Sequence, residues 1–74
     1  MLLSELEKNF YKAAKLTLNQ EYENALKIFL KIVEENRKYR DDGARKAMIS
    51  IFNLLGNSHS LTKQYQQELM MILY

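Results

Sequence analysis

The feature that most limits the fold of this chain is the near absence of residues that interrupt helices. Its 74 residues include no proline and only two glycines, and these two residue types are the usual punctuation of strands and turns. Apolar residues recur at the helical spacing i, i+3, i+4, i+7 instead of alternating as they would in strands. The sequence therefore predicts an all-α protein.

Four amphipathic segments follow one another, separated by short polar stretches. The first begins with a capping box, in which the Ser4 hydroxyl accepts a backbone N–H and Glu7 reaches back to the cap residue. It ends near Asn19, which we expect to adopt the left-handed conformation. The second segment covers about 21–37.

The third segment ends at Gly56, a residue that is free to adopt positive φ. Asp41 or Asp42 is expected to cap its start. Ser58 or Ser60 is expected to cap the fourth segment.

These segments predict one TPR-like (α-α superhelix) domain over 1–74, built from two antiparallel helical hairpins at about 4–38 and 42–73. The residues expected on the inner faces are Leu6, Phe10, Ala13, Ala14, Leu16, Tyr22, Ala25, Leu26, Phe29, Ile32, Val33, Ala44, Ala47, Met48, Ile51, Phe52, Leu55, Leu61, Tyr65, Leu69 and Ile72. A unit of this kind is either a small bundle or a slice of an α-solenoid.

The composition excludes several classes of function. The chain has no cysteine and one histidine, so we expect no disulfide, no metal site and no cofactor. A formal net charge of +2 is too small to indicate nucleic-acid binding. No apolar run approaches the length of a membrane span, and Ser4-Glu5 interrupts the apolar start that a signal peptide would need. We expect a cytoplasmic protein.

No group of residues predicts catalysis, so we expect a non-enzymatic protein. His59 has no cysteine or local acid to form a triad, and a loop histidine beside a helix cap explains it better. The adjacent carboxylates Glu34-Glu35 and Asp41-Asp42 point about 100° apart on a helix, which favours caps and a solvated face over acid–base chemistry.

The basic residues form two groups, one on the first segment and one before the acidic pair. They are Lys8, Lys12 and Lys15, followed by Arg37, Lys38 and Arg40. Glutamates interleave with them, and a solvated helix surface is the favoured interpretation.

The first hairpin resembles a tetratricopeptide repeat (TPR) through the stretch AKLTLNQEYENALKIF. In this resemblance Ala13 and Ala25 are the small residues at the helix crossing, and Phe29 is the aromatic residue one turn later. Arg37 replaces the usual final proline, and Asn9 replaces the usual tryptophan. Some TPR domains grip a terminal carboxylate with lysine and asparagine. Phe10 and Ala14 stand at those places, so this form of recognition is not expected.

The second half, RDDGARKAMISIFNLLGNSHSLTKQYQQELMMILY, closely resembles the C-terminal end of the thioredoxin-like co-chaperones called chaperedoxins. The resemblance rests on the start at Asp42-Gly43-Ala44-Arg45-Lys46, on Leu54-Leu55-Gly56, on Leu61 and Tyr65, and on the closing Leu73-Tyr74. It implies a protein-binding helical domain that works with chaperones, with the chaperonin or unfolded client proteins as partner. The thioredoxin domain of that family is absent from this chain.

The charge-poor C-terminal end is the predicted docking surface. We expect the fourth helix to bind a protein partner by helix-in-groove docking, with Met70, Met71 and Tyr74 as anchors and with Tyr65 and Gln66 at the margin. The alternative for these side chains is that they fold back onto the neighbouring helices. The alternative function is structural self-association, such as homodimer formation.

Overall fold

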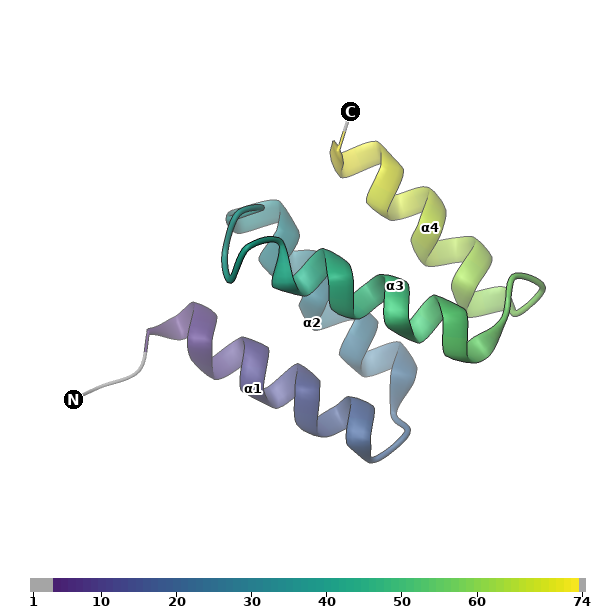
Figure 1. Ribbon diagram of the computed structural model, residues 1–74, viewed down its shortest axis with the longest axis horizontal. Helices are drawn as coiled ribbons and strands as arrows, with labels where there is room; N and C mark the ends of the chain where they lie inside the picture. Colours follow the sequence, from purple (N-terminus) through teal and green to yellow (C-terminus); the bar gives the residue numbers. More distant parts are fainter. Residues whose placement is uncertain (1–3, 74) are drawn as a thin grey trace.

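The computed structural model describes residues 4–73 and has four helices in that range (Figure 1). They are α1 (Glu5–Leu18), α2 (Tyr22–Glu35), α3 (Gly43–Leu55) and α4 (Ser60–Leu73). Consecutive helices run in opposite directions, and residues 4–73 contain no strand. The predicted all-α fold of two helical hairpins is confirmed.

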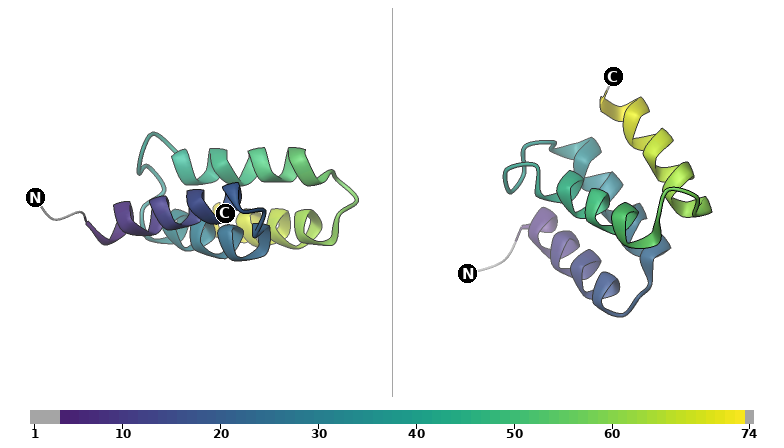
Figure 2. Two further views of the ribbon diagram at one scale, coloured as in Figure 1. Left: turned by 90° about the horizontal axis from the view of Figure 1, so that it is seen from below. Right: turned by 45° about the vertical axis from the view of Figure 1, so that its right-hand side comes forward.

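Helix α2 lies at the centre of the fold, because it packs against each of the other three helices. Figure 2 shows α3 lying over α2, with α4 on the far side of α3 from α1. Helix α4 contacts both α2 and α3. The two hairpins therefore share one core instead of forming two separate ones.

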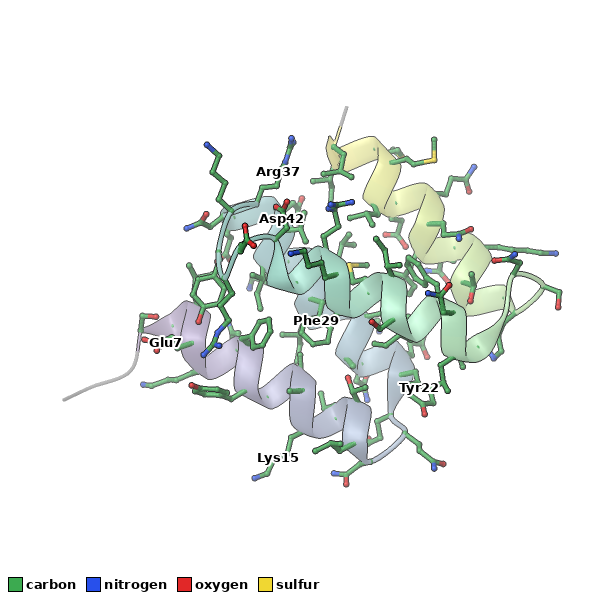
Figure 3. All side chains as sticks on the ribbon, in the orientation of Figure 1. Glu7, Lys15, Tyr22, Phe29, Arg37 and Asp42 are labelled. Carbon is green, nitrogen blue, oxygen red and sulfur yellow. The ribbon has the colours of Figure 1, made fainter. Side chains whose placement is uncertain are left out.

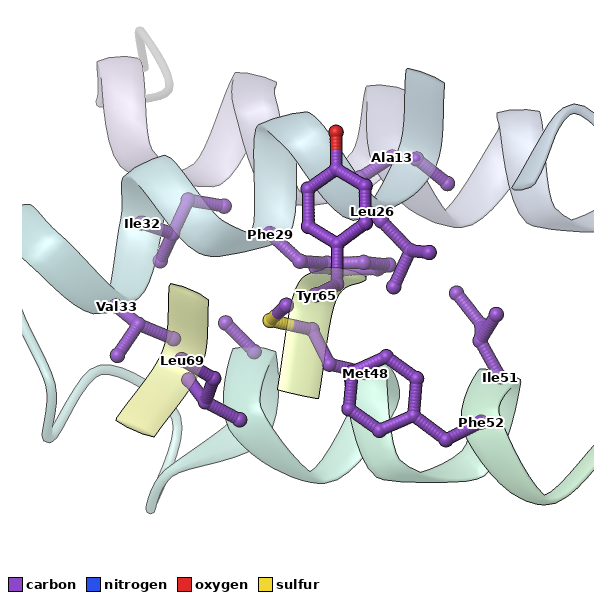
Figure 4. Packing of buried hydrophobic residues seen from close by; sticks show 12 residues of the cluster. Ala13, Leu26, Phe29, Ile32, Val33, Met48, Ile51, Phe52, Tyr65 and Leu69 are labelled. Carbon is purple, nitrogen blue, oxygen red and sulfur yellow. The ribbon is translucent and has the colours of Figure 1, made fainter. Parts of the chain in front are cut away.

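All four helices contribute side chains to this core (Figure 4). The buried apolar residues are Ala13, Ala25, Leu26, Phe29, Ile32, Val33, Ala44, Met48, Ile51, Phe52, Tyr65 and Leu69. Each of them belongs to the inner faces expected from the spacing. Within residues 4–73, Thr62 is the only buried polar residue, and its Oγ1 has no hydrogen-bond partner.

The start of α1 has the predicted capping box. The Ser4 Oγ accepts the Glu7 N–H at 3.1 Å, and Glu7 Oε1 accepts the Ser4 N–H at 3.3 Å. The end of α1 differs from the prediction by one residue. Asn19 has φ −88°, while Gln20 adopts the left-handed conformation with φ 63°.

The reason for that difference is a Schellman arrangement of hydrogen bonds. The Gln20 N–H donates to the Thr17 carbonyl at 3.0 Å, and the Glu21 N–H donates to the Leu16 carbonyl at 2.9 Å. This pattern requires its left-handed residue one position after the cap residue. At the end of α3, Gly56 has the expected positive φ of 93°.

The starts of α3 and α4 are capped differently from the prediction. Asp42 occupies the cap position of α3, but its side chain makes no capping hydrogen bond. Its carboxylate lies 3.8 Å from Arg45, and that of Asp41 lies 3.4 Å from Lys46. Before α4, the acceptor is His59 instead of a serine, since its Nδ1 accepts the Leu61 N–H at 3.0 Å.

The connection between α2 and α3 contains three successive left-handed residues. Arg40, Asp41 and Asp42 have φ values of 52°, 55° and 64°. This conformation costs about 1–2 kcal/mol for each residue that carries a Cβ. Such a turn persists only where surrounding contacts hold it, and the contacts of Arg40 described below do so.

Candidate functional site

The predicted docking residues of α4 lie on two different sides of the helix. Met70 and Met71 are 58% and 76% exposed. Met70 faces the boundary with α3, whereas Met71 lies in a shallow depression beside Leu30 of α2. Because successive helical residues point about 100° apart, the two methionines line different depressions, one beside α3 and one beside α2.

The other predicted residues divide between core, surface and the undescribed end. Tyr65 is only 2% exposed, so this side chain belongs to the core and not to the margin of a surface. Burial raises its pKa above the ordinary value of tyrosine, and the charges of Glu68 and Glu23 act in the same direction. Gln66 is exposed, and Tyr74 lies outside the described residues.

Met70 and Gln66 line an open depression between α3 and α4, which we call the C-terminal groove. It has a volume of about 280 Å³ and is lined by Ile49, Phe52, Asn53, Gln66, Leu69, Met70 and Leu73. Phe52 and Leu69 are core residues, so the groove is continuous with the hydrophobic core. No charged side chain is among its lining residues.

A second depression, which the sequence did not predict as a site, lies between α1 and α3. This inner groove has a volume of about 320 Å³ and is lined by Phe10, Ala14, Thr17, Phe29, Ala47, Ser50, Ile51 and Leu54. Its only polar side chains are Thr17 and Ser50, and the Thr17 hydroxyl already donates to the Ala13 carbonyl at 2.8 Å. Leu54 is exposed at its edge.

The positions of Phe10 and Ala14 in the sequence could have been used to predict the inner groove. They stand where other TPR domains carry the lysine and asparagine of a carboxylate clamp, and both line this groove. The interpretation that Phe10 is a hairpin contact holds as well, since its ring meets that of Phe29 edge-on at 5.5 Å between centroids.

The lysines of α1 form no part of either groove. Lys8, Lys12 and Lys15 gather around Tyr11, and Lys15 projects away from α3 (Figure 3). They match the solvated helix surface that the sequence favours.

The two arginines of the α2–α3 connection, in contrast, make long-range contacts. Arg37 Nη2 donates to the Ile72 carbonyl at 3.4 Å, which satisfies an acceptor left free in the last turn of α4. Arg40 Nη2 donates to the Tyr11 hydroxyl at 2.9 Å, and its Nε donates to the Tyr39 hydroxyl at 3.3 Å. The connection is thereby fixed to α1 at one side and to α4 at the other.

The remaining polar residues suggest no chemistry. His59 serves as a helix cap, as its hydrogen bond to Leu61 shows. The described residues include no group of three or more acidic, histidine or cysteine side chains placed to hold a metal ion. None of the described helices is long and apolar enough to span a membrane.

Two antiparallel helical hairpins packed on a shared core, with an apolar groove between the first helix of each, define an α-helical repeat protein. The sequence model of the tetratricopeptide repeat family matches residues 4–74. The chain belongs to the tetratricopeptide repeat family, whose members generally mediate protein–protein interaction. Neither the curated proteins nor the solved structures give a match to this chain.

Proposed function

We propose that this chain is the non-enzymatic docking domain of a chaperedoxin-type co-chaperone, acting in the cytoplasm through the C-terminal groove. The partner in this proposal is the chaperonin or an unfolded client protein. The resemblance of residues 40–74 to the C-terminal end of the chaperedoxins supports this partner class. The observation that best supports the proposed docking surface is the exposure of Met70 in an uncharged groove that opens onto the core.

The chemistry of the C-terminal groove suits a helical partner. A helix that places apolar side chains between α3 and α4 would cover Ile49 and Met70, both of which are exposed. Complete burial of one such side chain contributes about 1.5–3 kcal/mol. Methionine is flexible and polarisable, so it can adapt its shape to different partners.

The test is binding to purified chaperonin, measured by biolayer interferometry with point variants instead of a truncation. Truncation after Glu68 would remove Leu69, which is part of the core. We expect Met70→Glu to weaken binding more than tenfold, because the variant places a charge in an apolar contact. Met71→Glu is the matched control, since it is the same substitution on the neighbouring residue, outside the groove.

Circular dichroism of both variants establishes that the fold is intact. Unchanged binding by a folded Met70→Glu protein would refute the C-terminal groove as the docking surface. Absence of binding by the wild-type chain would refute the chaperonin as partner and direct the assay to unfolded clients.

Self-association is a second candidate function, favoured by one observation. Helix α3 covers one side of α2 in the first hairpin, whereas in the described part of the chain no helix covers the equivalent side of α4. A second copy could stack there, as neighbouring repeats do in a solenoid. Sedimentation equilibrium should then show a dimer that Met70→Glu dissociates, and a monomer at all concentrations would exclude this function.

A further inference from the structure

The methionine side chains of this chain differ sharply in their access to solvent. Within residues 4–73, Met48 is completely buried, whereas Met70 and Met71 are 58% and 76% exposed. The chain has no cysteine, so its exposed thioethers are the groups that a peroxide oxidises most readily. Met70 and Met71 are therefore the candidate oxidation sites, and their surroundings distinguish them.

The surroundings of Met70 include two donors of hydrogen bonds. Gln66 precedes it by one turn of α4, and Asn53 of α3 lines the same C-terminal groove. Both side chains are exposed, and each amide has two N–H donors. The remaining lining residues are apolar, so these two amides are the polar groups of the groove that an altered Met70 side chain can reach.

The surroundings of Met71 are of the opposite kind. Its depression is lined by Leu30, Glu34, Glu68 and Ile72, whose side chains are apolar or acidic. Ionised carboxylates only accept hydrogen bonds, so these side chains offer no donor to an oxygen added to Met71. The two methionines thus share their exposure but differ in the chemistry around them.

We propose that Met70 is a reversible oxidation site, whose sulfoxide accepts hydrogen bonds from Gln66 and Asn53 and makes the C-terminal groove polar. The oxidant is hydrogen peroxide or another hydroperoxide. The thioether sulfur attacks a peroxide oxygen, so an S–O bond forms and the O–O bond breaks. The sulfur is oxidised by two electrons, and the proton of the transferred oxygen passes to the departing oxygen, which leaves as water or an alcohol. A methionine sulfoxide reductase reverses the change with thiols as the reductant.

This modification changes the surface of the fold without reaching its core. Met70 is not part of the buried cluster, although its neighbour Leu69 is, so a sulfoxide at Met70 leaves the packing of α4 intact. An apolar partner would have to dehydrate the new oxygen, which is unfavourable, and oxidation therefore lowers the affinity of the groove. This consequence rests on the docking function proposed above, whereas the site of oxidation does not.

The first test locates the oxidation in the folded full chain. Hydrogen peroxide is added at neutral pH, and tandem mass spectrometry of proteolytic fragments follows each methionine separately. We expect Met70 and Met71 to be oxidised at least about tenfold faster than Met48, which becomes accessible only when the fold opens. Circular dichroism should show the same helix content before and after the reaction.

Two matched variants separate the exposed methionines. Within residues 4–73, Met71→Leu leaves Met70 as the exposed methionine, and Met70→Leu leaves Met71. Oxidation of the Met71→Leu protein should shift the side-chain amide NMR signals of Asn53 and Gln66, because both amides then donate to the sulfoxide. Oxidation of the Met70→Leu protein should leave these signals in place. Reductases for both sulfoxide epimers should restore the original signals.

The same two variants measure the effect on binding. Their dissociation constants with the purified chaperonin of the assay above are compared before and after oxidation, once the peroxide has been removed. Met71→Leu should lose about tenfold in affinity on oxidation, whereas Met70→Leu should bind equally well in both forms. Met1 is present in both variants, so any effect of its oxidation appears in both and can be subtracted.

Two results would overturn the proposal. The first is oxidation of Met70 that is as slow as that of Met48. The second is an equal response of the two variants to oxidation, either in the amide signals or in the affinity. Failure of the unoxidised wild-type chain to bind the chaperonin would refute the docking function instead, because the oxidation rates and the amide signals require no partner.

Discussion

The buried hydroxyl of Thr62 provides the sharpest test of the packing between α4 and the rest of the fold. Thr62 is fully buried, and its Oγ1 has no hydrogen-bond partner. Valine has nearly the same shape and the same branching at Cβ, so Thr62→Val removes the hydroxyl without opening a cavity. The variant should be more stable than the wild-type chain.

The expected gain follows from the cost of burying an unpaired hydroxyl. That cost is about 1–3 kcal/mol, and because valine and threonine have similar helix propensities little of the gain is offset. We take about 1 kcal/mol as the expected increase in the free energy of unfolding. For a domain of this size, that amount raises the melting temperature by about 4–8 °C.

The assay is thermal and urea unfolding followed by circular dichroism at 222 nm, with two control variants. Thr17→Val removes a hydroxyl that donates to the Ala13 carbonyl at 2.8 Å, so it should bring no comparable gain. Thr62→Ser keeps the unpaired hydroxyl and deletes the methyl group, so it should destabilise the fold. An unchanged or lower melting temperature for Thr62→Val would show that the hydroxyl does find a partner.

Three further predictions concern single backbone or side-chain features. Gln20→Gly should raise the free energy of unfolding by about 0.5–1 kcal/mol, because φ is 63° at this position and glycine adopts this conformation without a Cβ clash. Urea unfolding measures this gain, and the control variant Gln20→Ala should show none. Gly43→Ala should destabilise the fold despite the higher helix propensity of alanine, because a Cβ at this position would lie 2.9 Å from the Arg40 Cβ. If urea unfolding shows a more stable variant, the loop does not approach α3 this closely. Burial raises the pKa of Tyr65, so the neutral side chain stabilises the folded state. This stabilisation is complete below the pKa of tyrosine in the unfolded chain, about 10, and is lost as the pH rises through the higher pKa of the folded state. Urea midpoints should therefore fall more steeply above pH 10 in the wild type than in Tyr65→Phe, and parallel pH profiles would disprove the assignment.

The sequence predicted the helices and the core well, because both depend on local periodicity. The inner-face residues Ala13, Phe29 and Met48 are buried as expected. The capping box at Ser4 was also predictable, since all its hydrogen bonds lie within three residues. In each case the pattern and the contact occupy the same short stretch of chain.

The parts that were not predictable depend on contacts between distant residues or on the angle between helices. Arg40 meets Tyr11 across 29 residues, and Arg37 reaches Ile72 across 35. No local spacing encodes either contact, so both arginines looked like solvated charges. The inner groove arises from the separation of α1 and α3, which no stripe on either helix defines alone.

The candidate site at the C-terminal end was predicted only as a group of exposed apolar residues. Met70 and Met71 are both exposed, but helical geometry directs them to different neighbours. Tyr65 was assigned both to the core and to the margin of the surface, and the structure places it in the core. Composition thus located the charge-poor end, while the packing of α4 on α2 and α3 decided which side chains are accessible.

The central position of α2 sets the order in which this fold opens. Helix α2 packs against three helices, whereas within residues 4–73 the main contacts of α4 are with α2 and α3. Partial opening of α4 alone leaves the α1–α2 hairpin and its contact with α3 intact, so it requires less free energy than global unfolding does. Amide hydrogens of α4 will then exchange with solvent before those of α2. A partner bound at the C-terminal groove would slow this opening, so binding could be measured directly as slower amide exchange in α4.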